Sequence, residues 1–179
     1  MALLPVFDLD GTLLDSDEAL VAPFLALGIA RERIEFGLPL DEECARLGVR
    51  VGDYLRAYDV GRAKPYPGVP DVIERLDRWG VCSNKHPASG RAELDRLGWR
   101  PEVATFAEPG TGQKRLGPLL ERLGVAGAGV VFIGDTPHDR VCASVVGARF
   151  AIATWNPRAT AEPGDLVLRE PSDVLELVL

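Results

Sequence analysis

The chain has 179 residues, of which 46% are hydrophobic, and a formal net charge of −7. This size suits one domain, or one domain with an insertion, and the apolar content argues against a disordered chain. The acidic balance argues against non-specific binding of nucleic acid and against attraction to anionic membranes.

Cysteine usage and the absence of a targeting pattern indicate the compartment. Cys44, Cys82 and Cys142 are odd in number and lack C-x-x-C spacing, which is typical of reduced thiols. No basic region precedes Asp8, no small-residue cleavage site follows a long apolar core, and no apolar run approaches the ~20 residues of a membrane span. We therefore expect a cytoplasmic protein that has no membrane partner.

The first predicted strand covers residues 3–7 and leads directly into two carboxylates, Asp8 and Asp10. Gly11 and Thr12 then break the apolar run. If the strand belongs to a parallel sheet, both carboxylates leave its carboxyl end, where open α/β sheets place their ligand sites. Such a carboxylate could be a nucleophile, a metal ligand or a proton carrier, or it could simply belong to an acidic turn.

The next section, residues 15–66, reads as helical. Asp15 is a candidate N-cap with Glu18 three residues later, and Gly28 can end that helix. Two further helices are predicted over residues 39–47 and 51–58, and no convincing strand lies between Asp15 and Tyr66. We expect an all-helical insertion of modest size.

From Lys64 onward, short apolar runs alternate with helical patterns. This alternation predicts a mostly parallel sheet covered on both faces, a Rossmann-like, doubly wound α/β fold. The predicted strands are 80–82, 103–106, 129–133, 150–153 and 166–168, and the predicted helices are 69–79, 87–97, 114–123, 137–146 and 172–179.

Polar side chains follow several of these strands, and a parallel sheet would gather them at one edge. They are Asp8 and Asp10, Ser83 and Asn84, Lys114, and Asp135 with Asp139. Four carboxylates in one crevice repel one another, and a bound divalent cation relieves that repulsion. Oxygen ligands without a His or Cys cluster favour Mg²⁺ over Zn²⁺. A carboxylate nucleophile, a hard metal, a lysine and hydroxyl donors together suit phosphoryl transfer.

Each of these residues also has a simpler explanation. Ser83 and Asn84 could be turn residues, and Lys114 could be a solvated residue at a helix start. Asp139 could only close a capping box with Thr136. Lys85 is a rival cation beside Asn84.

Other nucleotide and hydrolase motifs are absent from the sequence. Residues 110–115 resemble a phosphate loop, but Gln113 and Arg115 stand where Gly and Ser or Thr are required. No G-x-G-x-x-G follows a predicted strand, and there is no G-x-S-x-G. We assign no chemistry to His86 or His138.

The order of these motifs resembles the haloacid dehalogenase-like hydrolases, and in particular their phosphoglycolate phosphatase-like branch. The resemblance covers residues 6–150. The segments that carry it are Asp8–Ser16, Ser83–Lys85, Lys114 and Gly134–Asp139. It implies a core domain of residues 1–14 and 67–179 and a small helical cap of residues 15–66.

The same resemblance implies a role for each site residue. Asp8 would be the nucleophile that forms an aspartyl-phosphate, and Asp10 would be the general acid and then the base. Mg²⁺ would bind Asp8, Asp135 and the main-chain carbonyl of Asp10, with Asp139 supporting it directly or through water. The phosphoryl group would be held by Ser83, Asn84 and Lys114.

The expected function is hydrolysis of a small phosphorylated metabolite by a Mg²⁺-dependent phosphatase. A phosphomutase that uses the same intermediate is one alternative. A non-catalytic module that binds Mg²⁺ or a partner is another. We expect a monomer or homodimer that binds no nucleic acid.

Overall fold

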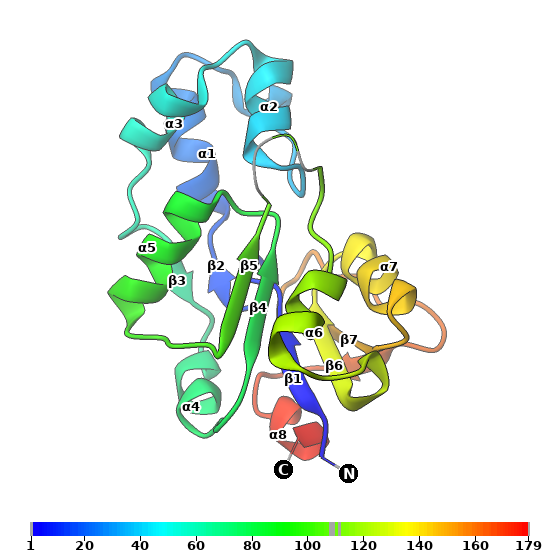
Figure 1. Ribbon diagram of the computed structural model, residues 1–179. Coiled ribbons are helices and arrows are strands. Elements are labelled where there is room, and N and C mark those ends of the chain that lie inside the picture. Colours follow the sequence, from blue (N-terminus) through cyan, green and yellow to red (C-terminus); the bar gives the residue numbers. More distant parts are fainter. Residues whose placement is uncertain (1, 108–109, 111, 179) are drawn as a thin grey trace.

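The computed structural model describes residues 2–107, 110 and 112–178. Its centre is a six-stranded sheet in the order β5-β4-β1-β6-β7-β8, in which every neighbouring pair is parallel (Figure 1). The strands are β1 (Leu4–Phe7), β4 (Gly80–Ser83), β5 (Val103–Phe106), β6 (Val130–Gly134), β7 (Arg149–Ala153) and β8 (Leu166–Leu168). The predicted doubly wound α/β fold is confirmed. All carboxyl ends of the strands open on one edge of this sheet.

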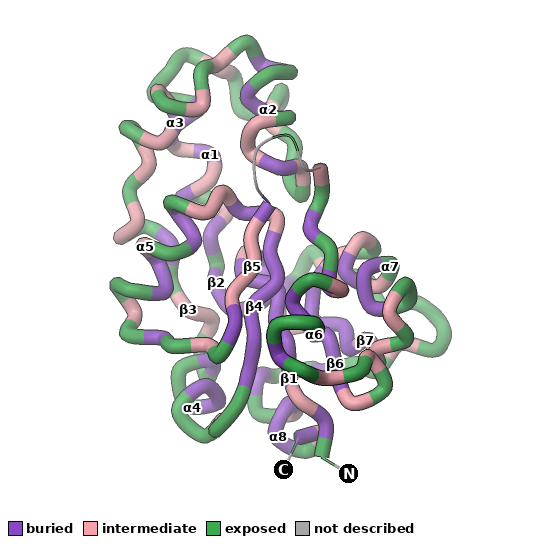
Figure 2. The backbone as a smooth tube through the Cα atoms, in the orientation of Figure 1, coloured by how far each residue is buried: buried purple, intermediate pink, exposed green. Residues whose placement is uncertain are grey.

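Helices cover both faces of the sheet because the strands are apolar on both sides. Along β6, Val131 and Ile133 pack into one hydrophobic cluster, while Val130 and Phe132 pack into another. This is the alternation expected of a buried strand. The first cluster includes residues of α4 (Val69–Glu74), α5 (Pro87–Leu97) and α8 (Asp173–Val178), and the second includes residues of α6 (Gly117–Leu123) and α7 (Pro137–Val145). Figure 2 shows the central strands as buried and the outer turns of the helices as exposed.

The segment between β2 (Leu14–Asp15) and β3 (Lys64–Pro65) forms the helical upper part of Figure 1. It has a small apolar cluster of its own, built on Phe24, Cys44, Leu47 and Tyr54. Its elements are α1 (Asp17–Ala26), the short 3₁₀ helix η1 (Arg31–Arg33), α2 (Leu40–Leu47) and α3 (Val51–Ala57).

The two-residue strands β2 and β3 correct the expectation that no strand lies between Asp15 and Tyr66. They pair antiparallel, with Leu14 opposite Pro65 and Asp15 opposite Lys64. The two ends of the helical segment therefore run side by side where they join the sheet domain. The exact division into a cap of residues 15–66 and a core stays a prediction.

Several predicted helix boundaries are wrong, and the largest shifts are at α4 and α6. The N-cap of α1 is Ser16 rather than Asp15, and it makes no side-chain capping bond. Helix α4 ends at Glu74 because Trp79 is pulled into the core, where its ring meets Phe7 edge to face. Helix α6 begins at Gly117 rather than at Lys114, since Pro118 fixes the backbone at the start of a helix.

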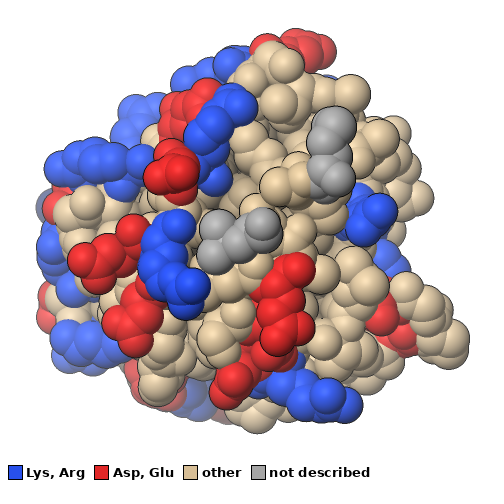
Figure 3. All heavy atoms as spheres, turned by 90° about the horizontal axis from the view of Figure 1, so that it is seen from below, with Lys and Arg blue, Asp and Glu red and all other residues tan. Residues whose placement is uncertain are grey.

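The predicted terminal helix is found as α8, which begins at Asp173, and the last residue of its predicted range, Leu179, lies outside the described residues. No helix in the described part of the chain is long and apolar enough to cross a membrane. On the face of the molecule that is seen from below, acidic and basic side chains are interspersed (Figure 3). That face presents no broad patch of one charge.

Candidate active site

The turn that follows β1 aims its carboxylates at the neighbouring strand ends. The N–H of Asp8 still donates to the carbonyl of Ile133 on β6, at 2.9 Å, so Asp8 continues the strand. Gly11 then adopts a φ of +80°, which favours glycine. A Cβ at Gly11 would also collide with the carboxylate of Asp135. Glycine at position 11 is therefore needed for the turn to close against β6.

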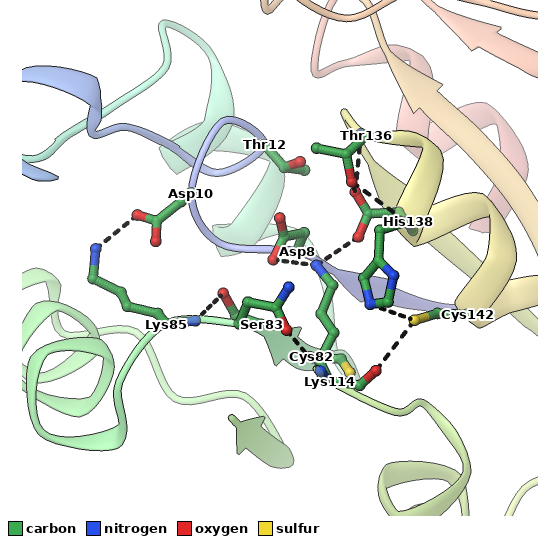
Figure 4. A network of polar contacts seen from close by, with 12 residues as sticks. Asp8, Asp10, Thr12, Cys82, Ser83, Lys85, Lys114, Thr136, His138 and Cys142 are labelled. Atoms are coloured by element: carbon green, nitrogen blue, oxygen red, sulfur yellow. Dashed lines mark hydrogen bonds and ion pairs between the residues drawn. The ribbon is translucent and has the colours of Figure 1, made fainter. Parts of the chain in front are cut away.

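Asp8, Asp135 and Asp139 form a buried cluster in which one carboxylate oxygen from each lies within 4.8 Å of the others. Lys114 lies among them, with its Nζ 2.8 Å from Asp8 Oδ1 and 2.5 Å from Asp139 Oδ1 (Figure 4). The sequence prediction that these strand ends meet is confirmed by this geometry.

Burial sets the charge state of this cluster. Burial raises the pKa of Asp8 to about 7, against the opposing effect of Lys114. Burial and the neighbouring Asp139 raise the pKa of Asp135 to about 6. Burial would lower the pKa of Lys114, but Asp139 and Asp8 raise it, so this lysine is charged. One ammonium faces three carboxylates, and the cluster is short of positive charge.

The donor set suits a hard divalent cation. All three clustered side chains offer carboxylate oxygens, which Mg²⁺ prefers. Among the described residues, no hydrogen bond of good geometry reaches Asp8 Oδ1 or Asp139 Oδ1, although both atoms are fully buried. Lys114 is the one cation that contacts these two oxygens among the described residues, and a metal ion would add the positive charge that buried carboxylate oxygens need. The Asp10 side chain is not part of this cluster.

Asp139 caps α7 and also belongs to the carboxylate cluster. Its carboxylate accepts from the backbone N–H of Thr136 at 3.0 Å, and its own N–H donates to the Thr136 hydroxyl, which closes the capping box of α7. The other oxygen faces Lys114. A Cβ on Gly134 would collide with the Asp139 side chain, so the glycine leaves room for this close approach.

Lys85 makes a second buried network, of which the sequence indicated only the lysine itself, as a cation beside Asn84. Its Nζ lies 2.7 Å from Asp10 Oδ1 and 3.0 Å from Glu93 Oε1. Tyr58, at the end of α3, donates its hydroxyl to the same Glu93 oxygen. Lys85 therefore holds Asp10 away from the other carboxylates (Figure 4), while Lys114 stays with Asp8.

Glu93 and Tyr58 were missed by the sequence analysis. Glu93 is fully buried, on the face of α5 that also carries Leu94. A charged residue on the apolar face of a predicted helix is the signal that could have identified it. Burial raises the pKa of Glu93 to about 7, although Lys85 opposes the rise.

Ser83 and Asn84 lie at the end of β4 and line the same cavity. The hydroxyl oxygen of Ser83 accepts from the N–H of Lys85 at 3.2 Å, which leaves its O–H proton for a ligand. The Asn84 side chain is used by the protein itself. It donates to the carbonyl of Gly37 in the helical segment at 2.9 Å and accepts from the N–H of Lys114 at 2.6 Å.

The loop after β7 supplies further contacts that were missed. Asn156 donates from Nδ2 to Asp135 at 2.8 Å and to the carbonyl of Gly11 at 3.0 Å. Thr12 donates to the other oxygen of Asp135 at 3.2 Å. Applying the strand-end argument to the strand predicted at 150–153 would have identified this loop, because it opens on the same edge.

A cavity of about 430 Å³ lies between the sheet edge and the helical segment, and Asp8, Asp10 and Asp135 line it together with Lys85 and Lys114. Its floor carries the carboxylates and the two lysines, and its opposite wall carries apolar residues of the helical segment. His138 lines it as well, and burial lowers the pKa of that imidazole. The lining residues from the helical segment are Asp17, Leu20, Phe36, Gly37 and Leu38.

Comparison with known proteins gives one consistent result. The family model described as "Haloacid dehalogenase-like hydrolase" matches residues 6–153. A phosphoglycolate phosphatase from Synechococcus elongatus is 30% identical over 97% of this chain and 95% of its own length. An N-acetylmuramic acid 6-phosphate phosphatase from Pseudomonas aeruginosa is 24% identical over 97% and 93%. The crystal structure of CbbY from Rhodobacter sphaeroides, in complex with phosphate, superposes with a TM-score of 0.75 at 20% identity, covering 97% of this chain and 96% of that one.

Proposed function

Because the chain belongs to the haloacid dehalogenase-like hydrolase family, whose members similar to it are phosphoric monoester hydrolases, we propose that it hydrolyses a small phosphomonoester through an aspartyl-phosphate on Asp8. The observation that carries this proposal is the position of Asp8. Its carboxylate is buried against Lys114 and two further carboxylates, and it lines the cavity together with Asp10. A nucleophile and a proton carrier thus face the same space.

The cofactor we propose is Mg²⁺, which phosphatases of this family generally use. Asp8, Asp135 and the main-chain carbonyl of Asp10 would bind it, and Asp139 would support it. When bound, the metal supplies the positive charge that lets an anionic phosphate approach an anionic nucleophile. The fit rests on the three clustered carboxylates and on two buried oxygens, Asp8 Oδ1 and Asp139 Oδ1, which among the described residues share Lys114 as their one cationic neighbour.

In the first half of the reaction, a carboxylate oxygen of Asp8 attacks phosphorus while the bond from phosphorus to the leaving alcohol breaks. Asp10 gives its proton to the departing oxygen, so the alcohol leaves neutral. Lys114 and the Ser83 hydroxyl hold the phosphoryl oxygens, with Asn84 beside them. The ammonium of Lys114 is already fixed by two carboxylates, so little reorganisation is needed.

In the second half, water attacks the phosphorus of the aspartyl-phosphate. Asp10, now ionised, takes a proton from that water, and the bond between phosphorus and Asp8 breaks. Inorganic phosphate leaves and both carboxyl groups return to their starting states. Lys85 holds Asp10 in place at 2.7 Å throughout.

The helical segment of residues 15–66 would act as the cap that closes the cavity over the substrate. It contributes five lining residues, and the Gly37 carbonyl is hydrogen-bonded to Asn84 beside the cluster. The small cavity suits a small phosphorylated metabolite.

The test is a Mg²⁺-supplemented screen of phosphorylated metabolites for release of inorganic phosphate, with Asp8→Asn as the matched control. EDTA should stop the reaction, and added Mg²⁺ should restore it. Hydrolysis that survives exhaustive chelation would contradict the metal assignment. An isomeric phosphate ester as product, without free phosphate, would identify a mutase instead. No chemistry on any phosphate ester would leave a binding module.

A further inference from the structure

The loop that follows β7 is fixed directly to the turn after β1. Trp155 donates from its indole Nε1 to the carbonyl of Thr12 at 2.8 Å. Asn156 donates to the carbonyl of Gly11 and to Asp135. Because three hydrogen bonds join this loop to the Asp8–Thr12 turn and to the carboxylate cluster, the next residues are held close to the reacting groups.

Arg158 extends from this loop into the cavity. Its backbone N–H donates to the Asn156 side chain at 3.0 Å, which sets the direction of the chain. Its guanidinium Nη2 lies 2.6 Å from Asp17, and its Cζ lies 4.6 Å from the centre of the Phe36 ring. Both of these contacts come from the helical segment. Arg158 therefore stands where the cavity wall passes from the sheet edge to that segment.

Arg158 differs from the two lysines that line the same cavity. The side chains of Lys85 and Lys114 are 2% and 3% exposed, and each contacts two carboxylates. The Arg158 side chain is 43% exposed, and Asp17, its ion-pair partner, is 34% exposed. Among the described residues, Arg158 is the cation of this cavity whose charge is not committed to the buried networks.

We propose that Arg158 is a specificity residue that binds a carboxylate of the substrate at the end distant from the phosphate. This inference rests on the proposed phosphatase function. The phosphate end lies against Asp8 and Lys114, and the carboxylate end reaches the guanidinium.

The charges in the cavity give such a residue a purpose. Asp8, Asp10, Asp17 and Asp135 all line it, so a second anionic group on the substrate would be repelled unless a cation received it. A guanidinium presents parallel donors that match a carboxylate in two hydrogen bonds. The charge of Arg158 is close enough to the cluster to oppose the rise that burial and Asp139 cause in the pKa of Asp135.

Asp17 and Phe36 explain how the guanidinium stays in place without a substrate. The exposed pair with Asp17 is weak, so a substrate carboxylate can replace it at little cost. The Phe36 ring can keep its contact with the guanidinium during that exchange. A carboxylate that replaces Asp17 would also connect the helical segment to the loop through the substrate.

The test compares two substrates that differ only at the end distant from phosphorus. Phosphoglycolate carries a carboxylate there, and 2-hydroxyethyl phosphate carries a hydroxymethyl group. For Arg158→Gln we expect kcat/KM for phosphoglycolate to fall about 10- to 100-fold, the usual worth of a charged hydrogen-bonded pair. The loss for 2-hydroxyethyl phosphate should be at least fivefold smaller. Arg158→Lys should restore part of the loss, since it keeps the charge but not the two-donor geometry.

The matched control is Arg78→Gln, which removes the same charge from an exposed pair with Glu102 outside this cavity. It should leave both substrates unaffected. Equal losses on both substrates in Arg158→Gln would overturn the inference and assign Arg158 to holding Asp17 and Phe36. No loss on either would overturn it as well.

A binding measurement distinguishes failure of this inference from failure of the proposed function. We would measure the increase in melting temperature that each ester gives to the wild-type protein and to Arg158→Gln, with Mg²⁺ present. A phosphoglycolate-specific increase that the variant lacks supports the inference, even if neither ester is hydrolysed. Equal increases, or none, would overturn it. Failure of hydrolysis alone would count against the phosphatase function only.

Discussion

The two buried lysines of the cavity invite comparison because they resemble each other in burial and differ in what they join. Lys114 contacts Asp8 and Asp139, both of them members of the carboxylate cluster at the sheet edge. Lys85 contacts Asp10 and Glu93, and Glu93 accepts a hydrogen bond from Tyr58 of the helical segment. One network is confined to the sheet domain, and the other connects that domain to the segment above the cavity.

Because of this difference, we expect the two lysines to have different roles. Lys114 offsets charge where the phosphoryl group would bind, so its network should act on the chemistry at phosphorus. Lys85 has Asp10, the proposed proton carrier, on one side and Glu93 on the other, so its network should act on the orientation of Asp10. Burial raises the pKa of Glu93 to about 7, and Lys85, which is shared with Asp10, opposes only part of that rise.

The largest expected effect lies in the Lys114 network. Asp8→Asn should abolish turnover, with a loss of at least ~10⁴-fold, because the amide cannot form the covalent intermediate. The fold should survive, since one of several repelling buried carboxylates is removed. Phosphate release and thermal melting should be measured on the same sample. Near wild-type activity in a folded variant would defeat the assignment of Asp8.

The next effect lies in the Lys85 network. Asp10→Asn can still accept from Lys85 but can neither donate nor take a proton, and we expect a loss of the order of 10²–10⁴-fold. An aryl phosphate leaves without much protonation, so its first step should suffer less than that of an alkyl phosphate. Hydrolysis of the aspartyl-phosphate would still be slow.

Rapid-mix kinetics should therefore show a burst of aryl alcohol in Asp10→Asn, followed by a slow steady state. A burst would show that loss of Asp10 slows hydrolysis of the aspartyl-phosphate, whereas loss of Asp8 prevents that intermediate from forming. A wild-type steady-state rate without a burst would return Asp10 to the role of a turn residue.

Removing the charge of Glu93 should change how the stability of the metal-free protein depends on pH. The folded-state pKa of about 7 lies above the unfolded value of about 4.5, so the folded protein holds a proton that the unfolded chain releases. This group's contribution to the free energy of unfolding should therefore fall as pH rises between those values, by about 2–3 kcal/mol. Glu93→Gln should lack this component.

Urea unfolding of both proteins at pH 5 and pH 8, in the presence of a chelator, measures the effect. The difference between wild type and Glu93→Gln should change across that range and stay flat above pH 8. Parallel pH profiles would mean that Lys85 keeps Glu93 ionised throughout.

Much of the fold and part of the site could be predicted because both follow from where apolar runs stop. Asp8, Ser83 and Asp135 come at or directly after strand ends, and parallel pairing brings those ends together. Lys114 was expected at a helix start and instead lies in the loop before α6. Its place in the cluster depends on tertiary contacts that no local pattern carries.

The residues that were missed have their partners far away in the sequence. Tyr58 meets Glu93 from a different helix, and Arg158 meets Asp17 across 141 positions. Read alone, each looks like an ordinary residue of a helix or loop. The contact between the sheet domain and the helical segment decides their roles, and that contact is set by how the segment sits over the sheet edge.

The smallest expected effect tests whether the helical segment acts on Asp10 at all. Tyr58→Phe removes the hydroxyl that donates to Glu93 and keeps the ring that lies over Lys85 and beside Tyr54. The stability loss should be about 1 kcal/mol, the usual worth of one buried hydrogen bond. If the network orients Asp10, pre-steady-state release of alcohol from an alkyl phosphate should slow about two- to fivefold more than release from an aryl phosphate, because in this first step mainly the alkyl leaving group needs protonation by Asp10. The matched control is Tyr54→Phe, in the same helix. The Tyr54 hydroxyl donates to the carbonyl of Leu20 at 3.0 Å and does not contact Glu93. This variant should cost similar stability and leave the ratio of the two substrates unchanged. An unchanged ratio in Tyr58→Phe as well would mean that Lys85 orients Asp10 without help from the helical segment. The contact of the Lys85 network with that segment would then have no effect on the reaction.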